Sequence, residues 1–297
     1  MFTRAIVRPP APNFSEGLTT IDLGAPDYQR ALEQHEAYCA ALEQCGLTLI
    51  RLEADPDDPD STFVEDTAVL FAPRGCPDED RSLSEPGNDA GARTHPLTQV
   101  VLTRPGAPSR AGEIASMRKV LANFYPSLLS IQSPGTLDGG DVCEAGNHFF
   151  IGISERTNEA GAQQLAELLA SLDYTASFVD IRGLDGKQSV PGAVATGSAS
   201  PGILHLKSGL AYLRDNRLVV IEALASRAEF RGYDLVSVNF DEEYAANCVS
   251  VNDHVLVAAG YPEFEGRLKD LGFQTITLEM SEFQKMDGGL SCLSLRF

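Results

Sequence analysis

Residues 246–278 read ANCVSVNDHVLVAAGYPEFEGRLKDLGFQTITL, and this stretch contains a polar opening, two short apolar runs, a periodic segment and a third apolar run. The runs at 249–251 and 255–258 flank three polar residues, which predicts two strands joined as a hairpin. Residues 262–271 repeat apolar side chains at spacings of three and four, which predicts a helix, and a third strand follows at 275–278. One unit therefore consists of two strands, a helix and a further strand.

The same unit recurs along the chain with a period of roughly 45–70 residues. The last copy has only one strand, 293–297, while the N-terminal part of the chain supplies a strand at 5–8 and a helix at 26–45. The simplest closure joins both termini in one unit, which predicts an α/β fold with five units in a ring; an open α/β sheet is the alternative. Each copy opens on a short polar segment that would face the centre of the ring, and the openings are Val64-Glu65-Asp66, Leu137-Asp138-Gly139-Gly140-Asp141, Leu204-His205-Leu206, Ala246-Asn247-Cys248 and Gly288-Gly289-Leu290-Ser291-Cys292.

The remaining elements follow from the same patterns. The segments 74–97 and 183–202 lack periodicity, so we expect them to be surface insertions. Neither segment separates two cores, and residues 1–297 are expected to form a single domain. Helices are expected at 110–125, 157–172 and 222–230, the last with the weakest pattern, and strands at 47–52, 67–71, 99–103, 128–132, 148–153, 210–213 and 218–221.

Composition and charge exclude several classes of protein. The 297 residues are 43% hydrophobic and 22% charged, which is typical of globular chains, and no apolar run approaches the ~18 residues that span a bilayer. The formal net charge of −19 disfavours nucleic acid as a partner, because phosphate backbones are also anionic. The first residues do not resemble a signal peptide. We therefore expect a cytoplasmic protein that binds neither nucleic acid nor a membrane.

The cysteines and histidines offer one candidate catalytic group. The six cysteines form no CxxC pair and show no ligand spacing with the five histidines, so no metal site is expected, and most should be buried free thiols. Cys292 is different, since the two glycines at 288 and 289 allow the backbone to approach a ligand closely. A cysteine nucleophile needs an acid–base partner and a group that orients it, for which His205 and Asp138 are candidates. Each signal alone is weak, because a histidine between leucines, like His205, is more often a core residue, and the string that begins at Asp138 is more often a turn or a calcium-like loop.

Three carboxylates suggest a cation-binding site. Glu65 and Asp66 begin an apolar strand, where adjacent carboxylates are costly to bury without a cation. The pair is either an exposed turn or a seat for a guanidinium, whose planar fork fits carboxylates in a bidentate manner. Asp60, five residues before Glu65, is able to extend such a seat.

The chain resembles the dimethylarginine dimethylaminohydrolase (dimethylargininase) family in five segments, taken together and in order: 62–66, 135–141, 204–209, 244–248 and 287–297. This family belongs to the guanidino-group modifying superfamily, with the arginine deiminases and amidinotransferases. The resemblance covers the chain except for the two insertions, and its C-terminal segment is the most specific. It implies a five-bladed α/β propeller of ββαβ repeats closed by both termini, in agreement with the ring of five.

The resemblance also implies an enzyme and a reaction. Such a hydrolase converts asymmetric dimethylarginine or monomethylarginine to citrulline plus dimethylamine or methylamine, through a covalent cysteine thiouronium and without a cofactor. By position, Cys292 would be the nucleophile, His205 the general acid and base, and Asp138 the carboxylate that orients His205. Some members carry Glu where this chain has Asp138.

The implied substrate-binding residues follow from the same motifs. Asp60, Glu65 and Asp66 would bind the guanidinium, Arg104 and Arg156 the substrate carboxylate, Leu18 would lie on a lid, and the backbone near Met286 and Asp287 would meet the amino-acid end. The expected partner is a small methylated arginine, with homodimer formation left open. Two other functions also remain open: an arginine or agmatine deiminase-type hydrolase, and a non-catalytic protein that binds arginine analogues.

Overall fold

The computed structural model describes residues 1–71, 98–184 and 202–297. The expected insertions at 74–97 and 183–202 lie outside the described residues, except for Gly183, Leu184 and Gly202. None of the helices in the described ranges is long and apolar enough to cross a membrane.

The described residues form five separate three-stranded sheets. In each sheet the first strand of the order pairs antiparallel with the middle strand, and the third pairs parallel with it. The sheets are β15 (Leu295–Arg296), β1 (Arg4–Val7) and β2 (Thr48–Arg51); β3 (Ala68–Phe71), β4 (Gln99–Leu102) and β5 (Leu129–Ser130); β6 (Val142–Ala145), β7 (His148–Ile153) and β8 (Thr175–Asp180); β9 (Leu210–Leu213), β10 (Arg217–Ile221) and β11 (Asp234–Val238); and β12 (Val249–Val251), β13 (His254–Ala258) and β14 (Gln274–Leu278).

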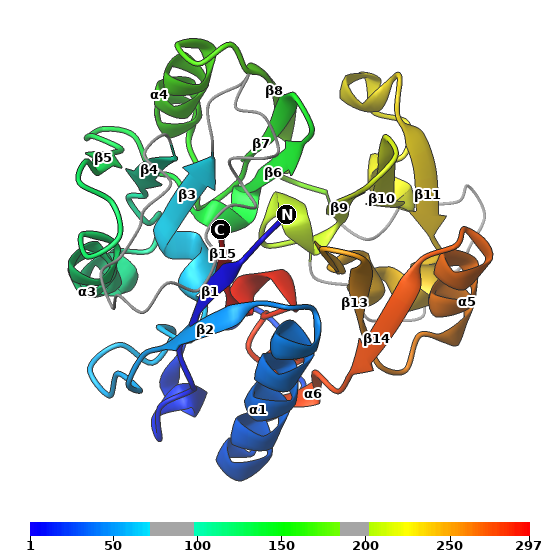
Figure 1. The fold of residues 1–297 in the computed structure, drawn as a ribbon, viewed down its shortest axis with the longest axis horizontal. Coiled ribbons are helices and arrows are strands. Elements are labelled where there is room, and N and C mark those ends of the chain that lie inside the picture. The colour runs from blue at the N-terminus through cyan, green and yellow to red at the C-terminus, as the bar shows by residue number, and fades with distance from the viewer. Residues whose placement is uncertain (72–97, 185–201) are drawn as a thin grey trace, which may run out of the picture.

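One sheet combines the two ends of the chain. Ala5 pairs with Arg296 and Ile6 with Leu295, so that β15 adds to β1 just as the first strand does in every other sheet. Figure 1 shows the five sheets arranged around a common centre, with both chain ends marked near the middle of the view. The predicted propeller of five ββαβ units, in which both termini complete one unit, is confirmed, and the alternative of one open sheet is wrong.

Helices connect the middle strand to the outer strand in four of the five sheets. They are α1 (Tyr28–Gln44), α3 (Ala111–Leu121), α4 (Glu159–Ala170) and α5 (Pro262–Asp270). Helix α1 begins at Asp27, whose side chain accepts a hydrogen bond from the Arg30 amide as an N-cap. The same helix buries Tyr38, whose hydroxyl lies 2.7 Å from Ser294 Oγ, and this contact joins the first helix to the residue directly before the C-terminal strand.

The helix expected at 222–230 is wrong. The structure has two 3₁₀ turns instead, η6 (Glu222–Leu224) and η7 (Ala228–Phe230). Their buried anchors, Leu224 and Phe230, are six residues apart, so no single helical face presents both to the core. Strands β6, β8 and β11 were not predicted, and the two outer strands among them, β8 and β11, bury only one or two residues each, which leaves a weak alternation to detect.

The polar openings of the units become 3₁₀ turns, each placed before the first strand of its sheet. They are η2 (Val64–Thr67), η4 (Gly139–Asp141), η5 (Leu206–Ser208), η8 (Phe240–Ala246) and η9 (Ser291–Leu293). Neighbouring turns are in contact: η2 contacts η9 and η4, while η5 contacts η4 and η8. Polar residues that are distant in the sequence therefore meet near the centre of the ring.

Candidate active site

A pocket opens among these central turns. Its lining comes from the loop segments before α1 and α4, from Arg110 directly before α3, and from the central turns and the segments that lead into them. The lining residues are Leu18, Asp60, Phe63, Asp66, Arg110, Arg156, Leu204, His205, Met286, Asp287, Gly288 and Cys292. The candidate nucleophile, the candidate acid–base residue and two of the three candidate guanidinium ligands thus share one cavity.

Cys292 lies on η9, is 8% exposed and lines the pocket. The two glycines before it are required by close approach, because a Cβ at Gly288 would lie 2.3 Å from the ring of Phe63, and one at Gly289 would lie 2.5 Å from the Asn247 side chain. Burial raises the pKa of the Cys292 thiol to about 12, and the nearby carboxylates of Glu65 and Asp66 add to that increase. The thiol is therefore neutral at physiological pH.

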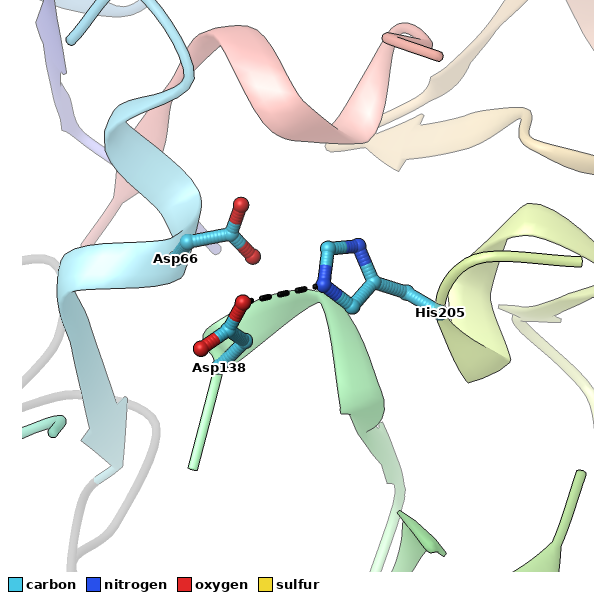
Figure 2. Close-up of side chains that lie close together, drawn as sticks. All are labelled: Asp66, Asp138 and His205. Atoms are coloured by element: carbon cyan, nitrogen blue, oxygen red, sulfur yellow. Dashed lines mark hydrogen bonds and ion pairs between the residues drawn. The ribbon is translucent and has the colours of Figure 1, made fainter. Parts of the chain in front are cut away.

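His205 lies directly before η5, and its Nε2 is 3.1 Å from Asp138 Oδ2 (Figure 2). Asp138 is completely buried, and its other oxygen accepts a hydrogen bond from the Gly106 amide. Burial opposes charge on the imidazole, but the carboxylates of Asp66, Asp138 and Asp141 outweigh it and raise the pKa of His205 to about 9. His205 is therefore an imidazolium at neutral pH, the form that is able to donate a proton.

Asp66 lies on η2 with its carboxylate directed toward the His205 ring (Figure 2). Its Oδ2 accepts a 2.6 Å hydrogen bond from Arg110, and its Oδ1 accepts one of 2.8 Å from the Gly140 amide. Burial opposes ionisation of this carboxyl, yet His205 and Arg110 lower its pKa to about 2. Asp66 is therefore a fixed negative charge facing the acid–base residue.

Arg110 is a pocket residue that the sequence analysis missed. Its guanidinium is buried and forms a two-point contact of 2.8 Å with each oxygen of Glu113, besides its bond to Asp66. In the sequence, Arg110 and Glu113 look like an ordinary pair one helical turn apart, which is most often exposed. The contact with η2 requires the folded ring, so local spacing carried no signal for it. Phe63, Leu204 and Gly288 also line the pocket, inside motifs whose other residues had been singled out.

Glu65 does not line the pocket, unlike Asp60 and Asp66. Its Oε1 lies 2.7 Å from Lys207 Nζ and 3.1 Å from Arg296, two cations supplied by the chain itself. Its Oε2 is buried and has no hydrogen-bond partner among the described residues. One carboxylate oxygen of Glu65 thus remains available, and its role as a guanidinium ligand stays a prediction.

The two arginines expected to bind the substrate carboxylate differ in position. Arg156 lines the pocket. Arg104 does not: its side chain is exposed and donates to the Gly135 carbonyl oxygen at 3.1 Å. The structure therefore brings only Arg156 of this pair to the cavity.

The remaining candidates, Leu18, Met286 and Asp287, all line the pocket. The Leu18 amide donates to Asp60 Oδ1 at 3.0 Å, and the amide of Thr20 donates to Asp287 Oδ2 at 2.5 Å. Two carboxylates thus hold the loop that carries Leu18 over the cavity.

One group of side chains satisfies the spacing of a metal site. Ligand atoms of Asp66, Asp138 and His205 lie within 4.8 Å of one another. Each of them already has a hydrogen-bond partner within the protein, since Arg110 donates to Asp66, and His205 is hydrogen-bonded to Asp138. Hydrogen bonding and charge within the protein therefore account for the arrangement.

A ring of five α/β units whose central pocket contains a cysteine, an imidazolium and buried carboxylates defines the class of cysteine-dependent hydrolases in the guanidino-group modifying superfamily. No family model matches the chain. It is 38% identical over 298 residues to N(G),N(G)-dimethylarginine dimethylaminohydrolase of Pseudomonas aeruginosa, covering 100% of both proteins. It is 31% identical to the protein of the same name from Streptomyces coelicolor, over 99% of this chain and 96% of the relative.

The solved structures agree with these relatives. A cysteine-to-serine variant of the P. aeruginosa enzyme complexed with citrulline superimposes with a TM-score of 0.81 at 36% identity, over 100% of both chains. An adduct of another dimethylarginine dimethylaminohydrolase variant with S-methyl-L-thiocitrulline gives the same TM-score and identity. The chain belongs to the dimethylarginine dimethylaminohydrolase family, as the resemblance of its motifs had indicated.

Proposed function

We propose that this protein hydrolyses asymmetric dimethylarginine and monomethylarginine to citrulline, releasing dimethylamine or methylamine through a covalent intermediate on Cys292. The observation that carries the proposal is the shared pocket of Cys292, a charged His205 and the anionic Asp66. The names of the full-length relatives and the citrulline and thiocitrulline complexes of the solved structures support the same reaction.

Substrate charge provides the means of activating the thiol. The Cys292 pKa of about 12 reflects a buried site with two carboxylates nearby, so the free enzyme holds little thiolate. A guanidinium bound beside Glu65 and Asp66 offsets their charge and adds a positive charge next to the sulfur. Substrate binding is therefore expected to lower the pKa of the thiol and to generate the nucleophile in contact with its target.

The chemical steps then follow from the positions of the two reacting groups. The Cys292 thiolate attacks the guanidinium carbon, forming a C–S bond. The bond from this carbon to the methylated nitrogen breaks, and the imidazolium of His205 gives its proton to the departing amine. Neutral His205 then removes a proton from a water molecule, whose oxygen attacks the thiouronium carbon. The C–S bond breaks, the proton of the new hydroxyl group passes to the departing sulfur, and citrulline leaves. The neutral thiol and the imidazolium are thereby restored, and the one proton released per cycle is the one that the thiol loses to solvent when the substrate binds.

Charged residues around the pocket account for binding of the two ends of the substrate. Asp60, Asp66 and the unpartnered oxygen of Glu65 are proposed to hold the guanidinium nitrogens. Arg156, and Arg104 if its side chain turns toward the pocket, would bind the carboxylate. The backbone near Met286 and Asp287 would meet the amino-acid end, under the loop that carries Leu18.

We also propose a cytoplasmic location, supported by the free state of all five cysteines in the described residues: Cys39, Cys45, Cys143, Cys248 and Cys292. A homodimer stays a prediction, as does the division of residues 1–297 into one domain with two insertions.

The experiment that tests the function identifies the amine released. Purified protein is incubated with asymmetric dimethylarginine, monomethylarginine and unmodified arginine, and the amines and citrulline are quantified. We expect dimethylamine and methylamine from the two methylated substrates, and their loss in Cys292→Ser. Release of ammonia from unmodified arginine as the preferred reaction would assign a deiminase, and absence of turnover on all three substrates would leave a binding protein.

A further inference from the structure

Cys292 lies on η9 and His205 directly before η5, and one side chain that follows η8 contacts both of these turns. Asn247 follows η8, is 6% exposed and does not line the pocket. We propose that Asn247 is a positioning residue that fixes the turn carrying Cys292 relative to the turn that follows His205. The inference rests on the proposed hydrolysis and adds to it a residue that does not touch the substrate.

The Asn247 amide uses both of its ends in this contact. Its Nδ2 donates to the carbonyl oxygen of Lys207 at 2.9 Å, two residues after His205. The same Nδ2 donates to Ser291 Oγ at 3.1 Å, and Oδ1 accepts a hydrogen bond of 2.9 Å from the Ser291 amide, the residue before Cys292. A carboxamide supplies donors and an acceptor in one plane, and the isosteric carboxylate lacks the donors.

The backbone of Gly289 packs against the side-chain amide of Asn247. A Cβ at this position would lie 2.5 Å from Asn247 Cγ and 2.6 Å from Oδ1, closer than side-chain atoms approach one another. The backbone before Cys292 therefore packs directly against the amide plane. Replacing Gly289 with alanine pushes these groups apart without removing any hydrogen-bonding group of Asn247.

This contact bears on catalysis because the two reacting groups act on the same substrate carbon and its leaving group. Their separation is determined by how η5 and η9 are placed, and no side-chain bond between Cys292 and His205 themselves is present among the described residues. A misplacement of about 1 Å by a change outside the reacting groups can cost on the order of 10²-fold in rate. Loss of the Asn247 contact is thus expected to lower kcat while leaving the substrate-binding residues in place.

The chain contains a matched control for this test. Asn252 Nδ2 donates to the carbonyl oxygens of Phe2, at 3.0 Å, and Cys45, at 2.8 Å, while its Oδ1 accepts from the Phe2 amide at 2.8 Å. Asn252 thus makes the same pattern of two donated bonds and one accepted bond, but it does not line the pocket, and none of these bonds reaches η5 or η9. Asparagine-to-aspartate substitution removes the same two donated bonds at either position.

The experiment compares Asn247→Asp, Asn252→Asp, Gly289→Ala and the wild type, measuring kcat and KM for dimethylamine release and the melting temperature of each. We expect Asn247→Asp and Gly289→Ala to lower kcat on the order of 10²-fold, with KM little changed. Asn252→Asp should keep the wild-type kcat even where its melting temperature falls as far as that of Asn247→Asp.

Several results would overturn the proposal. Wild-type kcat in folded Asn247→Asp would do so, as would an equal loss of kcat in Asn252→Asp, which would mark a general effect of destabilisation. Should Asn247→Asp not fold, a folded Gly289→Ala variant with wild-type kcat would be decisive against it. A wild-type protein that releases no amine would instead contradict the proposed function itself.

Discussion

Replacing His205 with glutamine removes a buried charge whose contribution to stability depends on pH. In the folded protein the neighbouring carboxylates raise the pKa of His205 from 6.5 to about 9, against the effect of burial. Because the folded-state pKa lies above the unfolded value, the charge stabilises the fold fully below the unfolded pKa, and this contribution is lost as the pH rises through about 9. The difference between the two pKa values corresponds to about 3 kcal/mol.

The measurement is the free energy of unfolding of the wild type and His205→Gln by denaturant titration, at about pH 6 and about pH 9.5. The wild-type advantage over the variant should be larger at the lower pH by about 3 kcal/mol, because glutamine has no charge at either pH. His148→Gln serves as the control, since burial lowers the pKa of His148. The advantage of the wild type over this variant in free energy of unfolding should not decrease as the pH rises between the two values. An advantage of His205 that is equal at both pH values would refute the assignment of His205 as a buried imidazolium.

Three further predictions concern the same pocket. Asp138→Asn should lower the pKa of His205 and shift the alkaline limb of the kcat profile to lower pH, and an unchanged profile would argue against Asp138 as its partner. Arg110→Ala should lower the free energy of unfolding by about 3–5 kcal/mol at neutral pH, since it removes the buried cation that pairs with Asp66 and Glu113; a loss below 1 kcal/mol, as at a surface ion pair, would contradict this. Alkylation of Cys292 by iodoacetamide in the free enzyme should keep accelerating through pH 9, as a thiol pKa of about 12 requires, whereas a plateau near pH 7 would show a preformed thiolate.

The arrangement of the ring could be predicted because its signals are periodic and repeated. Helices at 26–45 and 262–271 have apolar residues on one face, and the polar openings recur before each first strand. The incomplete last unit was enough to predict that both termini share a sheet. The outer strands and the segment 222–230 could not be predicted well, since they bury few side chains and leave only weak patterns.

From the pattern of units, the site was predictable where its residues belong to the openings, whereas Leu18, Arg156, Met286 and Asp287 were assigned from the family resemblance. Cys292, His205 and Asp66 are brought together because each lies at or beside a turn that faces the centre. Arg110 could not be found in this way, because its partner on η2 is 44 residues away in sequence. Position along the chain also gave no warning that Arg104 points outside the pocket, since side-chain direction at the end of a strand depends on the tertiary contacts it finds.

The covalent bond between Cys292 and the substrate carbon is the central step of this account. His205→Gln should still form this bond but hydrolyse it slowly, since the base that activates water is missing. The variant is incubated with S-methyl-L-thiocitrulline, whose methylthio group leaves without the proton that His205 gives to an amine, and is then digested and analysed by mass spectrometry. We predict an added amidine-derived mass on the peptide that contains Cys292, absent in His205→Gln/Cys292→Ser. An adduct on a different cysteine, or steady citrulline formation by Cys292→Ser, would contradict the mechanism.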